Sequence, residues 1–210
     1  MLDHEETGEL LERAGRGDLE ALDHLLEYHR ERLRHMVAVR LDQRLSARID
    51  ASDVVQEALA EAAERLLDYL RHRPMPFYLW LRELAWQRLS DLSRRHLSAE
   101  RRTVGREAFS RDQISDASAM HLADRLAGSG TSPSGRLRRE ERKEVVRTAL
   151  ARLDPADREL IVLRHLEQLS ISEVAAVLKI PEPTVRRRQR RVLEQLADLM
   201  ADIEHKETYP

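Results

Sequence analysis

The sequence predicts an all-α protein of two small helical domains joined by a flexible linker, the C-terminal one containing a helix-turn-helix. Apolar residues recur at helical spacing along most of the 210 residues, and no sustained period-two alternation indicates a strand. Aromatic residues make up only 4% of the chain and charged residues 35%, so we expect a modest aliphatic core, as in small bundles. A stretch rich in Ser, Gly and Asp separates two helical regions.

The composition also limits the classes of function. A formal net charge of -2 argues against a general polycation that coats nucleic acid, although the arginines are clustered. The absence of cysteine excludes disulfides and thiolate metal sites. The chain has no His-Glu-x-x-His motif, no glycine-rich phosphate loop and no Gly-x-Ser-x-Gly motif. We therefore expect no enzymatic activity, no cofactor, no metal site and no small-molecule substrate.

The sequence carries no signal for membrane insertion or export. The N-terminal stretch MLDHEETGEL is acidic and polar, unlike a signal peptide, and no apolar run reaches the length that spans a bilayer. We expect a cytoplasmic protein that does not associate with membranes.

The N-terminal domain is expected over residues 8–98 and opens with a helical region. Leu10–Leu45 carries leucines at helical spacing. Gly15 and Gly17 interrupt this pattern, and Asp18 is placed to cap a second helix. Such a region fits any helical bundle and predicts nothing about function.

The segment Ile49–Leu70 is predicted to be an amphipathic helix with Asp50 or Ser52 as its N-cap. Its polar face gathers four side chains, Asp53, Gln56, Glu57 and Glu64. By pattern alone this is most often a solvated face. A hydrogen-bonding face of this kind also suits reversible docking of a partner protein.

A basic loop and an aromatic helix come next. Two prolines in three residues predict a loop over Arg71–Pro76. The following helix, Phe77–His96, carries both tryptophans of the chain. Basic and aromatic side chains together can bind single strands, because bases stack on rings while cations contact phosphates. Phe77 and Trp80 share a core spacing with two leucines, however, so burial is the stronger interpretation for both.

Residues 99–139 are expected to form the linker. This segment loses the leucine spacing, and the stretch AGSGTSPSG within it cannot bury enough apolar surface to fold. The C-terminal domain is expected over residues 140–203. Its first two helices are separated at Leu153, with Asp154 as the N-cap and Pro155 in the first helical position.

The stretch from Ser170 to Leu196 is predicted to form two short helices with a tight break between them. Ser170 followed by Glu173 is a capping-box pattern, which starts the first helix. Residues 179–181, Lys-Ile-Pro, break that helix, and the second is expected from about Thr184.

The second helix has a buried stripe and an arginine-rich side. Val185, Val192 and Leu196 recur at i, i+7 and i+11. The arginines that lie mostly off this stripe are Arg186, Arg187, Arg190 and Arg191. Arginine runs are usually solvated faces, but a capped helix followed by a proline break favours a helix-turn-helix that enters a DNA major groove.

The stretch from Ala149 to Leu196 resembles the C-terminal DNA-binding domain of extracytoplasmic-function (ECF) sigma factors of bacterial RNA polymerase, in the sigma-70 family. The matching features are the Leu-Asp-Pro opening, Arg158, the Leu163-Arg164 pair, the Ser-x-x-Glu-Val-Ala run and Thr184-Val185. The chain departs from the family pattern at three places, which are Gln168-Leu169 in place of a glycine, Pro181-Glu182-Pro183 in place of Ser-x-Gly, and Gln189 in place of an apolar residue.

The N-terminal half carries further motifs of the same family. Asp-x-x-Asp-Val-Val-Gln-Glu is similar to the motif that holds the clamp helices of RNA polymerase. The polymerase-binding residues that this implies are Asp50, Asp53, Gln56 and Glu57. Phe-x-x-Trp-Leu, followed by an Ala, an Asp and paired arginines, resembles the promoter-melting region. The implied minus-ten DNA contacts are Arg71, His72, Arg73, Trp80, Gln87, Arg88, Asp91, Arg94 and Arg95. The implied minus-thirty-five contacts are Thr184, Arg186, Arg187, Arg190 and Arg191.

The resemblance implies a transcription initiation factor that binds core RNA polymerase and promoter DNA and opens the promoter. An anti-sigma factor is a further partner that the family implies. The alternative is a helix-turn-helix regulator that binds duplex DNA without joining polymerase, and such a protein would not need the Asp53–Glu57 face. A helical adaptor that binds only proteins would not explain the arginines of the second helix.

Overall fold

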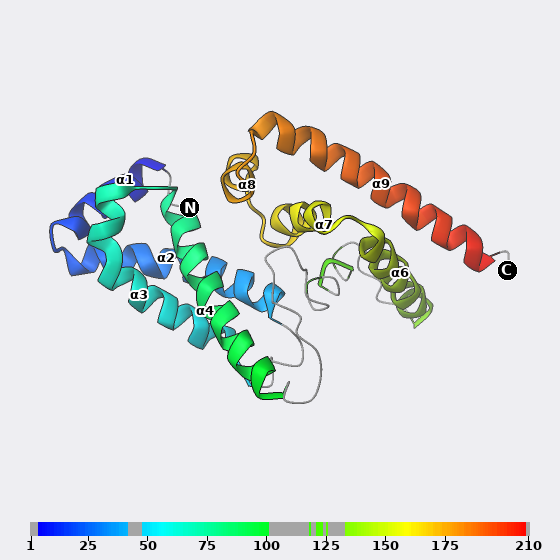
Figure 1. Cartoon of the computed structure of the whole chain (residues 1–210), viewed down its shortest axis with the longest axis horizontal. Helices are drawn as coiled ribbons and strands as arrows, with labels where there is room; N and C mark the ends of the chain where they lie inside the picture. Colours follow the sequence, from blue (N-terminus) through cyan, green and yellow to red (C-terminus); the bar gives the residue numbers. More distant parts are fainter. Residues whose placement is uncertain are drawn as a thin grey trace. The chain divides into compact units, whose positions relative to one another are not determined.

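The computed structural model describes residues 4–41, 48–100, 118, 121–123, 125 and 133–208. All regular secondary structure in these residues is helical, which confirms the predicted fold class. The chain divides into two compact units, Met1–Phe109 and Ser110–Pro210 (Figure 1). Within the described ranges, no helix combines the length and the apolar character that crossing a membrane would require.

The first unit is a helical bundle around an aliphatic core. Its helices are α1 (His4–Gly15), α2 (Leu19–Arg40), α3 (Ala51–His72) and α4 (Phe77–Glu100). Helices α2, α3 and α4 pack against one another, and α1 packs against α2 and α3 (Figure 1). Leu25, Leu33 and Leu81 are fully buried between them.

Two carboxylates start the helices of this unit as the sequence predicts. Asp18 caps α2, because its Oδ1 accepts a hydrogen bond of 3.0 Å from the Ala21 amide. Gly17 precedes it with a φ of 93°, a left-handed conformation that glycine adopts at little cost. Asp50 caps α3, accepting from the Ser52 amide at 2.7 Å, so of the two candidate caps Asp50 takes the role.

The loop predicted over Arg71–Pro76 begins two residues later in the structure, so the predicted start is wrong. Helix α3 continues through His72, and Arg73 ends it in a left-handed conformation with a φ of 35°. The proline that follows, Pro74, excludes helical geometry only for the residue before it, so the two preceding residues remain helical.

Two other boundaries of the first unit also differ. Helix α2 ends at Arg40, and the rest of the predicted helical region, residues 42–47, lies outside the described residues. Helix α4 runs to Glu100 rather than ending at His96. No glycine or proline stands between these two positions, so nothing in the local sequence stops the helix.

The second unit surrounds another aliphatic core, which includes Leu150, Leu160 and Leu163. Its helices are α6 (Pro133–Arg152), α7 (Pro155–Ile161), the short π-helix η1 (Val162–Leu166), α8 (Ile171–Leu178) and α9 (Glu182–Thr208). Helix α9, orange to red in Figure 1, packs against α6, α7 and α8.

The region expected as a linker contains packed residues. Helix α6 begins at Pro133 rather than at Glu140, because proline is tolerated in a first turn. Ser118, Leu122 and Ala123 are helical and fully buried. Residues 101–117 lie outside the described residues. The linker was predicted from the average composition of residues 99–139, which does not reveal individual apolar positions such as Leu122 and Ala123.

Candidate partner and nucleic-acid interfaces

Helix α8 begins and ends as its sequence predicts. The Ser170 Oγ accepts from the Glu173 amide at 3.2 Å, and the Glu173 carboxylate accepts from the Ser170 amide at 2.7 Å. This reciprocal pair is the predicted capping box. At the other end Lys179 is left-handed, with a φ of 55°, and its amide donates to the Ala175 carbonyl.

Helix α9 begins at Glu182, two residues before the predicted Thr184. The Pro181 carbonyl accepts from the amides of Thr184, at 2.9 Å, and Val185, at 3.1 Å, which closes the first turn. Pro183 fits within this turn because its missing N–H would have had no helical partner. Val185 and Val192 are fully buried and Leu196 is nearly so, which confirms the predicted stripe.

The four arginines predicted to face DNA are all exposed, but their surroundings differ. Arg186 forms an ion pair of 2.9 Å with Glu182, one turn earlier on α9. Arg187 and Arg190 form no hydrogen bond or ion pair with any residue that the structure describes. These two side chains are therefore available to bind a polyanion without breaking an existing contact.

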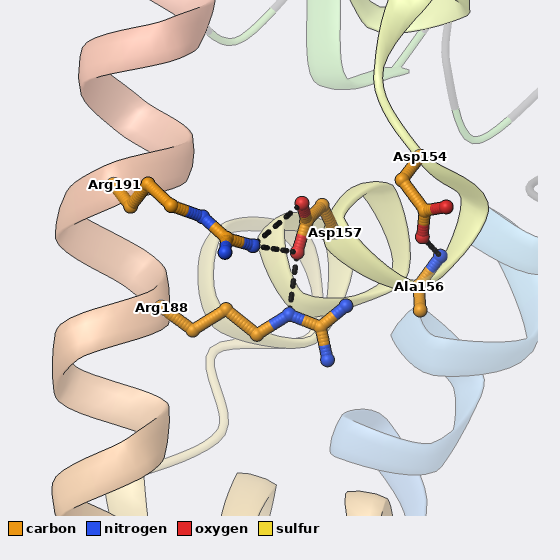
Figure 2. Close-up of polar contacts among 5 residues, drawn as sticks. All are labelled: Asp154, Ala156, Asp157, Arg188 and Arg191. Carbon is orange, nitrogen blue, oxygen red and sulfur yellow. Dashed lines mark hydrogen bonds and ion pairs between the residues drawn. The ribbon is translucent and has the colours of Figure 1, made fainter.

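Arg191 belongs to a cluster around Asp157 on α7 (Figure 2). Its Nη2 donates to both carboxylate oxygens of Asp157, at 3.2 and 3.0 Å. The Arg188 Nε donates to the same carboxylate. Nearby, Asp154 caps α7 by accepting from the Ala156 amide at 2.9 Å, as predicted.

Sequence reasoning missed Asp157 and Arg188 as members of one cluster. The two arginines are three residues apart and therefore lie on one side of α9. That spacing indicates a shared acidic partner. It does not identify one, because Asp157 lies 31 residues before Arg188.

The turn that leads into α8 is held by Arg164. Its Nη1 donates to the Leu169 carbonyl, and its Nε donates to the Gln189 side chain at 3.4 Å. Gln189 stands where the family pattern has an apolar residue. Here it accepts a hydrogen bond that joins the turn to α9.

Gln168, which takes the place of the family glycine, is left-handed with a φ of 57°. Gln168→Gly is expected to raise the free energy of unfolding by about 0.5–1 kcal/mol, because glycine removes the strain of the side chain. Gln195→Gly is the matched control, in the exposed interior of α9, and should lower it by about 1 kcal/mol. Urea denaturation followed by circular dichroism measures both, and a loss of stability in Gln168→Gly would contradict the prediction.

The predicted docking face on α3 is exposed at Asp53, Gln56 and Glu57. Asp50 has the separate role of capping the helix. Beside this face, α2 and α3 border an open groove of about 650 Å³. Its lining includes Asp23 and Glu27 from α2 and Gln56 from α3.

Trp80, one of the predicted minus-ten contacts, is buried, and its assignment to a DNA surface is wrong for this structure. Trp80 is only 8% exposed, and its ring stacks on that of Tyr69 with 4.6 Å between the ring centroids. Phe77 packs against it at 5.6 Å. The core interpretation is confirmed. Sequence reasoning also missed Tyr69, whose hydroxyl donates to the Met75 carbonyl at 3.0 Å and ties down the loop after α3.

The other predicted minus-ten residues lie at the surface of the first unit. Exposed among them are Arg71, His72, Arg73, Gln87, Arg94 and Arg95, while Arg88 and Asp91 are half-buried. Two of these arginines form ion pairs with acidic residues on the same helix. Arg71 pairs with Asp68 at 3.1 Å, and Arg94 pairs with Asp91.

Arg88 is held by a contact between helices. Its guanidinium pairs with Glu61 of α3 at 2.8 Å, and Arg65 pairs with the same carboxylate at 2.7 Å. Burial of Glu61 disfavours its charged form, but hydrogen bonds from Arg65 and Arg88 outweigh it and hold the pKa of Glu61 below its usual value. Arg88 therefore links α4 to α3 before any DNA is bound.

Comparison with known proteins places these features in a family context. Residues 149–198 match the family model described as Sigma-70, region 4. The RNA polymerase sigma-H factor of Pseudomonas aeruginosa is 29% identical over 197 residues, which cover 93% of this chain and 94% of that protein. The ECF RNA polymerase sigma-E factor of Escherichia coli K12 is 29% identical over 191 residues, covering 89% and 90%.

A solved structure has a similar fold. It is that of CnrH in complex with the cytosolic domain of CnrY, with a TM-score of 0.51 and 23% sequence identity. The alignment covers 92% of this chain and 96% of that chain. At this level of identity the likeness shows the fold alone.

Proposed function

We propose that this chain, a member of the extracytoplasmic-function branch of the sigma-70 family, is a transcription initiation factor that directs core RNA polymerase to specific promoters. The observation that carries the proposal is that one chain combines an exposed docking face on α3 with a helix-turn-helix that exposes arginines on α9. A regulator that acted on duplex DNA alone would need only the second unit, yet the relatives align over nearly the whole chain. The proposed role is regulatory rather than enzymatic, and it is exercised in the cytoplasm, where RNA polymerase works.

The first unit is proposed to provide the polymerase contact. Asp53, Gln56 and Glu57 lie exposed on consecutive turns of α3 and offer hydrogen-bond donors and acceptors to a partner helix. Asp50 supports them by fixing the start of the helix.

The same unit is proposed to contact and open the minus-ten element. The surface residues at the end of α3 and along α4 supply the cations for this contact, and Trp80 supports them from the core. The proposed minus-ten residues are Arg71, His72, Arg73, Gln87, Arg88, Asp91, Arg94 and Arg95.

The second unit is proposed to bind the minus-thirty-five element through α9. Arg187 and Arg190 are the proposed base readers, because both are exposed and neither is engaged within the described residues. Arg186, tied to Glu182, and Thr184 flank them. The Arg191 side chain is 64% exposed despite its ion pair, which leaves N–H groups for a DNA phosphate.

An anti-sigma factor is a further proposed partner. The support is indirect, since the fold neighbour CnrH was solved in complex with the cytosolic domain of CnrY.

The double variant Asp53→Ala, Gln56→Ala is expected to weaken binding to core RNA polymerase by about tenfold or more, the loss typical of the few central interface residues that carry most of the binding energy. Both side chains are exposed, so helicity should not change. Glu9→Ala, on the exposed side of α1, is the control with the same change in net charge. Fluorescence titration with core enzyme measures the affinity, and an unchanged affinity in the double variant would remove α3 from the interface.

Run-off transcription with purified core polymerase over a genomic promoter library tests the function as a whole. The expected result is a defined set of transcripts that depends on this chain. Duplex DNA binding without any transcript would favour the regulator that does not join polymerase.

A further inference from the structure

The buried carboxylate of Asp157 contacts two arginines of α9, the helix proposed to bind the minus-thirty-five element. The Asp157 side chain is 7% exposed, and it accepts hydrogen bonds from Arg188 and Arg191 (Figure 2). The Arg188 side chain is 25% exposed, whereas the Arg191 side chain is 64% exposed and reaches the surface. A carboxylate so little exposed needs hydrogen-bond donors in place of water, and the two guanidinium groups supply them.

The element that carries Asp157 is itself fixed. Asp157 lies in the first turn of α7, and its amide donates to the Asp154 carbonyl at 3.0 Å. Asp154 in turn caps α7 through the Ala156 amide. The carboxylate is therefore presented from a rigid turn, and α7 packs directly against α9.

The spacing of the arginines determines what this contact controls. Each residue of an α-helix is rotated by about 100° from the one before it, so two anchors three residues apart fix the rotation of α9 about its own axis more closely than its buried stripe alone does. Arg187 and Arg190 each directly precede one of the anchored arginines, Arg188 and Arg191. Fixing the anchored pair therefore also fixes the direction in which the two unengaged arginines point.

We infer that Asp157 is a positioning residue for promoter reading: it holds α9 in the rotation that directs Arg187 and Arg190 toward the DNA bases. This inference rests on the proposed function of α9 as the minus-thirty-five reader. It adds a residue on another helix, outside the DNA surface, that determines sequence preference.

Asp157→Asn tests the inference because two explanations predict opposite signs. The substitution keeps the shape of the side chain but removes one negative charge beside the DNA surface. If only charge matters, binding to every DNA sequence becomes tighter. If Asp157 positions α9, binding to the preferred duplex weakens although the unit has become more positive.

The experiment uses the full-length chain and two duplexes, the one preferred by the wild type in a selection from a random library and a scrambled version. For Asp157→Asn, the ratio of the two dissociation constants is expected to fall by about tenfold, the size of one lost base contact. The control Asp198→Asn removes the same charge from an exposed position on α9 and should leave the ratio unchanged. An unchanged ratio in Asp157→Asn, with both affinities raised as in the control, would overturn the inference.

A second variant covers the case in which Asp157→Asn does not fold, as judged by circular dichroism. Arg188→Lys keeps the charge but loses the Nε–H that binds Asp157, so its ratio is also expected to fall. A wild-type ratio in a folded Arg188→Lys protein would overturn the inference. A wild-type chain without any sequence preference would instead refute the proposed reader itself, a result visible before any variant is compared.

Discussion

Trp80→Ala is expected to destabilise the first unit by about 3–5 kcal/mol, the usual cost of removing a large buried aromatic side chain. The ring is stacked on Tyr69 and packed against Phe77, so its removal leaves a cavity in the centre of the aromatic cluster. Small domains are stable by only about 5–15 kcal/mol, so the variant should unfold at a much lower urea concentration. Tryptophan fluorescence isolates this unit, because Trp80 and Trp86 are the two tryptophans of the chain and Trp86 remains as the probe.

Gln87→Ala is the control on the same helix. Its side chain is exposed and, among the residues that the structure describes, bonds only to Glu83 one turn earlier, so the free energy of unfolding should change by less than about 0.5 kcal/mol. A Trp80→Ala protein that keeps its stability but fails to open promoters would show that this ring acts on DNA after all.

Arg187→Ala combined with Arg190→Ala is expected to remove most of the sequence preference of the second unit. Arginine can bond guanine O6 and N7 together, which is worth roughly 1–3 kcal/mol of discrimination for each base read. Neither side chain has a partner to lose among the described residues, so the unit should stay folded. Arg186→Ala should have a smaller effect, because Glu182 already neutralises part of its charge.

A binding selection on duplex libraries, repeated at several salt concentrations, measures this effect. Arg142→Ala, which removes an exposed charge from α6, is the control and should leave the selected sequence unchanged. A phosphate contact would reveal itself differently, by weakening all sequences alike and reducing the salt slope by about one per charge. If the double variant selects the wild-type sequence with wild-type affinity, α9 does not read bases.

The sequence predicted those parts of the fold whose causes are local. Ser170 with Glu173 and Asp154 with Ala156 each lie within three residues, and both caps form as expected. The buried stripe of α9 also follows from spacing alone. Helix boundaries were predicted less well, as at His72 and Pro133, because a proline disfavours helical geometry mainly for the residue before it and is itself tolerated in a first turn, so its position alone does not mark a helix end.

The parts that could not be predicted are contacts between distant segments. Asp157 meets Arg191 across 34 residues, and Arg164 meets Gln189 across 25. Local pattern leaves many acids as equally good partners for each arginine, and tertiary packing selects among them. Trp80 is a different case, since its spacing favoured burial and only the family resemblance placed it on DNA. Its burial against Tyr69 and Phe77 confirms the interpretation from spacing.

Helix α9 has 27 residues and so spans about 40 Å without a joint. The arginines lie near its start, whereas Ile203, near its other end, is buried. Because α9 is one unbroken helix, a displacement of the end that carries Ile203 would also change the direction of the end that carries the arginines. Under the proposed function, a molecule that bound and moved the C-terminal end of α9 would therefore inhibit promoter reading without covering any of the arginines.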